Sequence, residues 1–70
     1  MIKKIYGLLS CKLCRIAKEK FPEAEYILIE SIDSIKRAEL ENKCYIIGQI
    51  KAPILLDENN NIIKHEDVGL

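Results

Sequence analysis

The sequence lacks the features that mark nucleic-acid-binding proteins and membrane proteins. Tryptophan is absent, and one phenylalanine and three tyrosines are too scattered to form a base-stacking platform. Eleven basic and eleven acidic residues cancel, so the net charge of zero offers no general attraction to nucleic acid or an anionic membrane. No apolar run approaches the roughly 18 residues of a transmembrane helix. We therefore expect neither nucleic acid nor a membrane among the partners.

Cysteine is scarce, and its number is odd. Three cysteines do not suit a closed disulfide framework. In a reducing compartment, a close pair of cysteines is more often catalytic or metal-binding than structural. The apolar run before Cys11 has only five residues and is interrupted by Gly7, whereas an export segment needs roughly 7–15 apolar residues. We therefore expect a cytoplasmic protein.

Length and composition favour one small globular domain over residues 1–70. Hydrophobic residues make up 49% of the chain, which is enough for a compact core and argues against disorder. A chain of this length buries only about 60% of its unfolded surface, so the core is expected to be marginal.

The first part of the chain predicts a strand followed by a helix. Residues 2–6 are rich in apolar side chains and predict a strand that Gly7 ends. Ser10 is the expected N-cap of the helix. The helix is expected to close before Pro22, because proline disfavours helical geometry in the residue that precedes it. The predicted apolar face of the helix consists of Leu13, Ile16, Ala17 and Phe21.

A second strand and a second helix are predicted next. Residues 24–30 contain a short β-branched run, as expected of a strand buried on both faces. With the preceding strand and helix they make a right-handed βαβ unit, so the two strands should be parallel. Residues 34–43 predict a second helix with a thin apolar stripe, after which Gly48 turns the chain.

The last third of the chain predicts a β-hairpin. Residues 49–51 lead into Ala52-Pro53, and the strands at residues 54–56 and 61–64 flank a turn rich in acidic residues and asparagine. These residue types tolerate the positive φ angles that a tight turn demands. The remaining residues, 65–70, have space for one helical turn at most.

Cys11 and Cys14 stand where the first helix is predicted to begin. The first turn of a helix leaves backbone N–H groups unpaired and carries the positive end of the helix dipole, and both stabilise a thiolate. Lys12 and Arg15 add positive charge nearby. Because the thiolate is the attacking species in disulfide exchange, we predict that Cys11 is the nucleophile. Cys14, one turn further in, is expected to be more buried and to resolve the mixed disulfide.

The order of these elements, with Cys-x-x-Cys between a strand and a helix and Ala52-Pro53 before a hairpin, resembles the thioredoxin superfamily. The likeness is greatest to glutaredoxins and small glutaredoxin-like thioredoxins. It implies an α/β thioredoxin-like minimal fold of β-α-β-α-β-β order. The four-stranded mixed sheet should have strand order 2-1-3-4, and the C-terminal helix should be short or missing. The implied activity is that of a thiol–disulfide oxidoreductase, a glutaredoxin- or thioredoxin-like protein disulfide reductase that uses Cys11 and Cys14.

The resemblance also implies a set of substrate-binding residues. Tyr6 falls where many glutaredoxins have a tyrosine, and Ala52–Pro53 would be a cis peptide beside the dithiol. The Ala52 backbone would then pair with an extended substrate, while Lys51 could contact a carboxylate and Lys12 a docking partner. Tyr6 could instead fill the core, and the basic face of the first helix could simply be solvated.

The implied partners are a disulfide-containing protein or a small thiol as substrate, and a source of electrons. No bound cofactor is expected. Leu8 and Lys51 stand where glutathione-binding members usually have lysine and threonine. The electron donor is therefore left open between glutathione and a flavoprotein reductase.

Other interpretations of the same residues stay open. The cysteine pair could be structural, or Cys11, Cys14, Cys44 and His65 could form a zinc set, although their spacing matches no common zinc module. A redox-inert adaptor that keeps the fold for docking is a third possibility, because a fold does not fix an activity. Cys44 is expected at the core or its boundary, with a regulatory thiol as the alternative. His65 is expected to be solvated.

Overall fold

The computed structural model describes residues 1–48 and 51–70. Residues 49 and 50, part of the predicted connection into the hairpin, lie outside the described residues. The elements in chain order are β1 (Ile2–Gly7), α1 (Lys12–Lys20), β2 (Glu25–Leu28), η1 (Ile29–Ser31), α2 (Ser34–Ile47), β3 (Ile54–Asp57), β4 (Ile62–Ile63) and η2 (His65–Val68), where η marks a 3₁₀ turn.

The sheet has the predicted strand order. β1 pairs in parallel with β2 and antiparallel with β3, and β3 pairs antiparallel with β4. The resulting order, β2-β1-β3-β4, confirms the α/β fold class and is consistent with a minimal thioredoxin-like layout. The C-terminal helix of that layout is reduced to the single turn η2, as expected.

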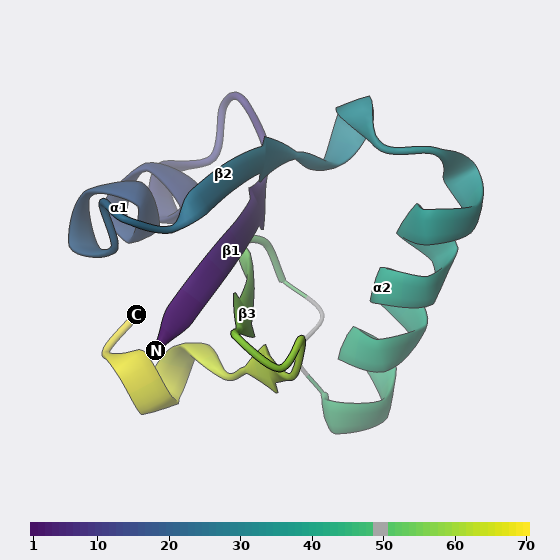
Figure 1. Ribbon diagram of the computed structural model, residues 1–70. Coiled ribbons are helices and arrows are strands. Elements are labelled where there is room, and N and C mark those ends of the chain that lie inside the picture. The colour runs from purple at the N-terminus through teal and green to yellow at the C-terminus, as the bar shows by residue number, and fades with distance from the viewer. Residues whose placement is uncertain (49–50) are drawn as a thin grey trace.

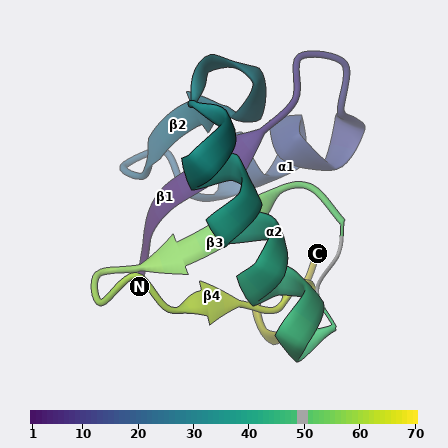
Figure 2. The same cartoon turned by 90° about the vertical axis from the view of Figure 1, so that its right-hand side faces the viewer.

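The two α-helices cover opposite faces of the sheet (Figure 1). In the view of Figure 2, α2 lies in front of the strands and α1 behind them. The three buried residues of β3 are divided between the cores on the two faces of the sheet, because successive side chains of a strand point to opposite faces. The α1-side core contains Ile2, Ile5, Ala17 and Leu55, and the α2-side core contains Tyr6, Leu40, Cys44, Ile54 and Leu56.

An irregularity in β1 decides which of its residues face which helix. The pairing register with β3 shifts between Ile2 and Lys4. Ile2 and Ile5 are three residues apart and would lie on opposite faces of a regular strand. Because of the shift, both contribute to the α1-side core.

The start of α1 differs by one residue from the prediction. Cys11, and not Ser10, is the N-cap, since the Cys11 Sγ accepts a hydrogen bond from the Cys14 N–H at 3.2 Å. Cys11 also has the extended backbone of a cap residue, with φ −94° and ψ 118°. The assignment of Ser10 was wrong because serine is the more common cap, whereas here a sulfur atom does the capping.

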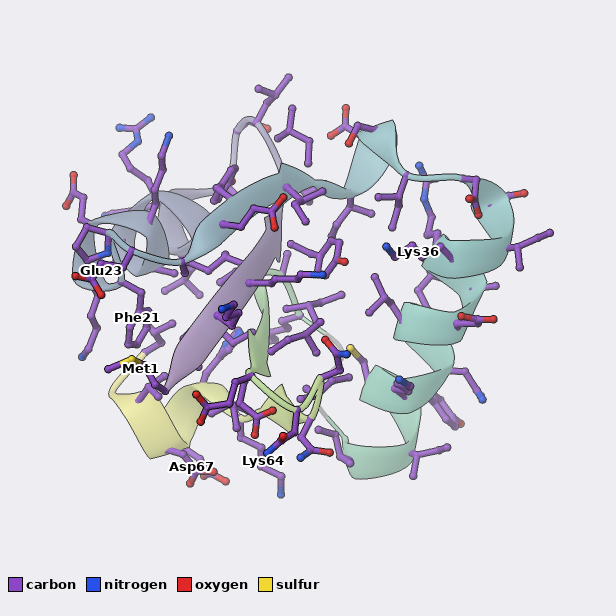
Figure 3. All side chains as sticks on the ribbon, in the orientation of Figure 1. Met1, Phe21, Glu23, Lys36, Lys64 and Asp67 are labelled. Carbon is purple, nitrogen blue, oxygen red and sulfur yellow. The ribbon has the colours of Figure 1, made fainter. Side chains whose placement is uncertain are left out.

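The buried face of α1 is also rotated from the predicted one. Cys14 and Ala17 are fully buried, and Phe21 packs against the α1-side core. Ile16, which was assigned to the apolar face, is 40% exposed. Figure 3 shows Phe21 between the end of α1 and η2. The rotation brings Cys14 inward, which leaves Ile16 to face outward.

The predicted burial of the second strand on both faces and the predicted end of the second helix were wrong. β2 ends at Leu28, and because it lies at the edge of the sheet, its apolar side chains are only half-buried. α2 continues to Ile47, beyond the predicted end, and Gly48 terminates it in the left-handed conformation with φ 77°. With fourteen residues α2 is the longest helix in the described ranges, and no helix there has the length and apolar character to cross a membrane.

His65 is buried, so the prediction that it is solvated was wrong. Only 9% of its surface is exposed, and its Nε2 lies 2.6 Å from the Pro53 carbonyl oxygen. A carbonyl oxygen only accepts, so Nε2 carries the proton in this bond. The turn η2 carries His65 inward, while Lys64 and Asp67 point away from the sheet (Figure 3). The bond ties the C-terminal segment to the loop that precedes β3.

Candidate redox site

Cys11 caps the N-terminus of α1 and remains accessible. Its side chain is partly exposed, and its Sγ accepts the hydrogen bond from the backbone N–H of Cys14. The Cys11 carbonyl accepts the first intrahelical bond, from the Arg15 N–H at 3.2 Å. The N-cap position places the sulfur beside an otherwise unpaired N–H and at the positive end of the helix dipole.

Cys14 lies one helical turn further in and has no exposed surface. Its Sγ accepts a hydrogen bond from the Leu8 N–H at 3.5 Å. The pKa of the Cys14 thiol is raised to about 11, chiefly by burial and in part by the neighbouring Cys11 side chain, while bonds with Leu8 and Tyr26 oppose the rise. Cys14 is therefore a neutral thiol at physiological pH.

The two cysteines thus differ in the way that was expected from the sequence, with an accessible first sulfur and a buried second one. Both are free thiols, as is Cys44. Disulfide exchange starts with the accessible sulfur, because attack requires both a thiolate and a path to the substrate. The arrangement is chemically suited to a sequence in which Cys11 reacts first and Cys14 follows.

A shallow hollow lies beside Cys11. Its volume is about 190 Å³, and α1, β2 and the loop after β1 line it. Lys18 and Arg15 contribute positive charge to its wall, and the Lys18 Nζ lies 5.2 Å from the centre of the Tyr26 ring. Lys12, one of the predicted substrate contacts, is exposed on the same first turn of α1.

The loop before β3 carries the other predicted substrate contacts. The Ala52–Pro53 peptide is cis, which confirms the expectation from the resemblance. Pro53 is fully buried, whereas Lys51 is exposed and Ala52 is half-buried. Lys51 and Ala52 line a mostly apolar groove of about 420 Å³ that also includes Leu8, three residues before Cys11. The groove therefore joins the predicted substrate loop to the dithiol loop.

Tyr6 occupies a different place from the other predicted contacts. It is 1% exposed and packs in the α2-side core with Leu40 and Leu56. Tyr6 lines neither the hollow beside Cys11 nor the groove at Ala52. Its contacts in the structure are those of a core residue.

The four residues of the alternative zinc set do not meet. Cys44 lies in the α2-side core, and the His65 ring is engaged with Pro53. In the part of the chain that the structure describes, no three cysteine, histidine or acidic residues lie close enough to hold a metal ion.

Two residues at the site were not found from the sequence. Tyr26 on β2 places its hydroxyl against the dithiol loop, where it donates a hydrogen bond to the Leu8 carbonyl at 3.2 Å. Gly7 provides the space, because a Cβ atom there would collide with the Tyr26 hydroxyl. The sequence holds one signal for this contact. Gly7 ends the first strand and Tyr26 lies in the second, and an aromatic ring often packs over a glycine of a neighbouring strand.

No model of a known protein family, no curated protein and no solved structure matches this chain. What the chain can do is therefore inferred from its own residues and their geometry.

Proposed function

We propose that this protein is a thiol–disulfide oxidoreductase of the thioredoxin superfamily, a glutaredoxin- or thioredoxin-like protein disulfide reductase acting in the cytoplasm. One observation carries the proposal. The Cys11 sulfur caps a helix and is accessible, while the Cys14 sulfur one turn away is buried and held as a thiol. A pair of cysteines with a purely structural role does not need one accessible and one buried sulfur, whereas disulfide exchange uses an accessible sulfur for attack and a protected one for resolution.

The reaction follows from the positions of the two sulfurs. The Cys11 thiolate attacks one sulfur of a substrate disulfide, the substrate S–S bond breaks, and the departing thiolate takes up a proton. Cys14 then loses its proton and attacks the Cys11 sulfur of the mixed disulfide. The second substrate thiol leaves, and an internal Cys11–Cys14 disulfide remains. Two electrons have passed to the substrate, and glutathione or a flavoprotein reductase returns them to the protein.

The substrate is best bound across the groove that Leu8, Ala52 and Ile54 line. An extended polypeptide next to its disulfide would place apolar side chains on this surface. Lys51 at the groove offers a cation for a carboxylate, either of an acidic side chain or of glutathione. Both a disulfide-containing protein and a small thiol are therefore proposed as reaction partners.

The decisive experiment measures the reduction of insulin disulfides by dithiothreitol, followed by turbidity, with and without the protein. We expect the wild-type protein to accelerate the reaction. Cys11→Ser should reduce the rate to that of dithiothreitol alone. Cys14→Ser should accumulate a mixed disulfide with substrate, detected by mass spectrometry. Cys44→Ala is the matched control for the loss of a buried thiol. Cys44 is 3% exposed among the residues that line the groove, and it takes no part in the exchange between Cys11 and Cys14, so the variant should still accelerate the reaction.

Two results would overturn the proposal. One is a wild-type protein that forms no internal Cys11–Cys14 disulfide under mild oxidation and leaves the insulin reaction unchanged. The other is a purified protein that holds one equivalent of zinc through these thiols, which would favour the metal-binding interpretation.

A further inference from the structure

Tyr26 reaches the dithiol from the edge strand β2. Its hydroxyl donates a hydrogen bond to the Leu8 carbonyl oxygen at 3.2 Å, and the N–H of the same Leu8 donates to the Cys14 Sγ at 3.5 Å. The Leu8 backbone therefore stands between the phenol and the sulfur and contacts both. The two side chains also influence each other directly, since Tyr26 lowers the pKa of Cys14 and Cys14 raises the pKa of Tyr26.

The position of Tyr26 depends on Gly7. In the parallel pair β1 and β2, Tyr26 is paired with Ile5, and Gly7 with Leu28, so all four residues belong to one face of the sheet. A Cβ atom on Gly7 would clash with the Tyr26 hydroxyl and lie 3.1 Å from the Cys14 Cβ. Because Gly7 has no side chain, the Tyr26 phenol can lie across the end of β1 next to Cys14.

The surroundings keep the Tyr26 hydroxyl protonated. Burial is the main cause that raises the Tyr26 pKa above 10.0, and the charges on Cys14 and Cys11 raise it further. At neutral pH the group is therefore a donor. The Lys18 ammonium lies 5.2 Å from the ring centre in a cation–π contact. The titratable groups that act on Cys14 are Cys11 and Tyr26, and the charged groups in the hollow beside Cys11 are Arg15 and Lys18.

We propose that Tyr26 is a catalytic residue of the resolving step, whose hydroxyl turns from the Leu8 carbonyl to the Cys14 sulfur and stabilises the Cys14 thiolate as it forms. The proposal rests on the proposed thiol–disulfide exchange. It supplies a second donor to the Cys14 sulfur, which is buried and has only the 3.5 Å contact with the Leu8 N–H in the structure, and a buried thiolate forms more readily when more donors stabilise it.

The Cys14 proton passes to water at the partly exposed Cys11 side of the dithiol, and the Cys14 thiolate accepts the hydrogen bond from Tyr26, which keeps its own proton throughout. The thiolate attacks the Cys11 sulfur, so the Cys11–Cys14 bond forms and the bond from Cys11 to the substrate sulfur breaks. The substrate leaves as a thiolate and takes up a proton from water. The Tyr26 hydroxyl then returns to the Leu8 carbonyl.

The test uses the aromatic disulfide dithiobis(nitrobenzoate), whose coloured thiolate is released once when Cys11 attacks and again when Cys14 resolves. The reagent is kept below the protein concentration, so that each mixed disulfide resolves internally. Tyr26→Phe keeps the ring and removes only the hydroxyl. We expect an unchanged first phase and a second phase slowed about tenfold or more, the value of a hydrogen bond to a charged group. The pH at which the second phase accelerates should move upward.

Two further variants separate this role from a structural one. Tyr45→Phe also removes a phenol hydroxyl, but from an exposed side chain on α2 that lines the proposed substrate groove. Because resolution is an internal reaction of Cys14 with Cys11, this variant should leave the second phase unchanged, and it is compared with Tyr26→Phe in that phase alone. Gly7→Ala keeps the hydroxyl but displaces it, and should slow the second phase as Tyr26→Phe does. A loss of thermal stability alone would not move the pH profile of the second phase.

The outcomes are distinct. If Tyr26→Phe resolves at the wild-type rate with the wild-type pH profile, the role of Tyr26 is refuted while disulfide exchange stands. If the wild-type protein shows no second phase, both this inference and the proposed function fail.

Discussion

At the scale of single residues, the backbone between β1 and α1 decides how the two sulfurs differ. The Cys14 N–H donates a hydrogen bond to the Cys11 sulfur, and the Leu8 N–H donates one to the Cys14 sulfur. Each sulfur thus accepts one hydrogen bond from the backbone, so the main difference between the two cysteines is how deeply each is buried. Cys11 keeps a path to solvent, whereas burial raises the pKa of Cys14 to about 11.

This difference predicts selective alkylation. In the folded, reduced protein at pH 8, iodoacetamide should modify Cys11 and spare both Cys14 and Cys44, since burial raises the pKa of each of the latter two. For Cys14, the smaller thiolate fraction alone should slow the reaction on the order of a hundredfold relative to the unfolded chain. Peptide mass spectrometry after timed quenching measures the three rates. Unfolding in guanidinium is the control, and Cys14 labelling as fast in the folded protein would contradict the assignment.

At the scale of elements, the turn between β3 and β4 is organised by one carboxylate. The Asp57 Oδ1 accepts hydrogen bonds from the Asn61 N–H at 2.9 Å and the Asn59 N–H at 2.8 Å. Asn60 takes the left-handed conformation with φ 63°, which asparagine tolerates better than most residues. The acidic and asparagine-rich composition therefore predicted the hairpin for a reason that the structure makes explicit.

The turn predicts a pH dependence of stability. The bonds from Asn61 and Asn59 lower the pKa of Asp57 below 3.8. A lowered pKa in the folded state means that the stabilisation is present above about pH 3.8 and is lost as the pH falls through the folded value. Asp57→Asn should lower the thermal midpoint at pH 7 by a few °C, with the difference from wild type shrinking in acid. Thermal melts followed by circular dichroism at several pH values measure this.

Glu58→Gln is the matched control for that series, because Glu58 is an exposed neighbouring carboxylate outside these bonds. A difference between wild type and Asp57→Asn that stays constant down to pH 2 would show that the carboxylate charge is not what stabilises the turn.

At the scale of the whole molecule, a C-terminal turn supports the loop beside the dithiol. His65 in η2 bonds to Pro53, and Val68 and Leu70 pack against the α1-side core. A chain of 70 residues has little stability to spare, at about 0.05–0.15 kcal/mol per residue. The buried hydrogen bond between His65 and Pro53 is therefore expected to be a sizeable share of the free energy of unfolding.

His65→Ala should lower the free energy of unfolding by about 2 kcal/mol, since it leaves the Pro53 carbonyl without this donor and opens a small cavity. Urea denaturation measures the change. Glu66→Ala alters the exposed neighbour in the same turn and should stay within about 0.5 kcal/mol of wild type. A His65→Ala midpoint equal to that of wild type would refute a supporting role for η2.

The sequence by itself determined the order of elements and the place of the dithiol, because these depend on short-range signals. Apolar periodicity, Pro22 and the acidic turn act within a few residues and were sufficient for the order of the elements, whereas the strand order of the sheet was expected from the resemblance to the thioredoxin superfamily. The tertiary structure decided what depends on contacts between distant segments. Tyr26 reaches Cys14 only because β2 pairs with β1 in one register and Gly7 leaves room. His65 is buried for the same reason, since a partner twelve residues away has no local signal.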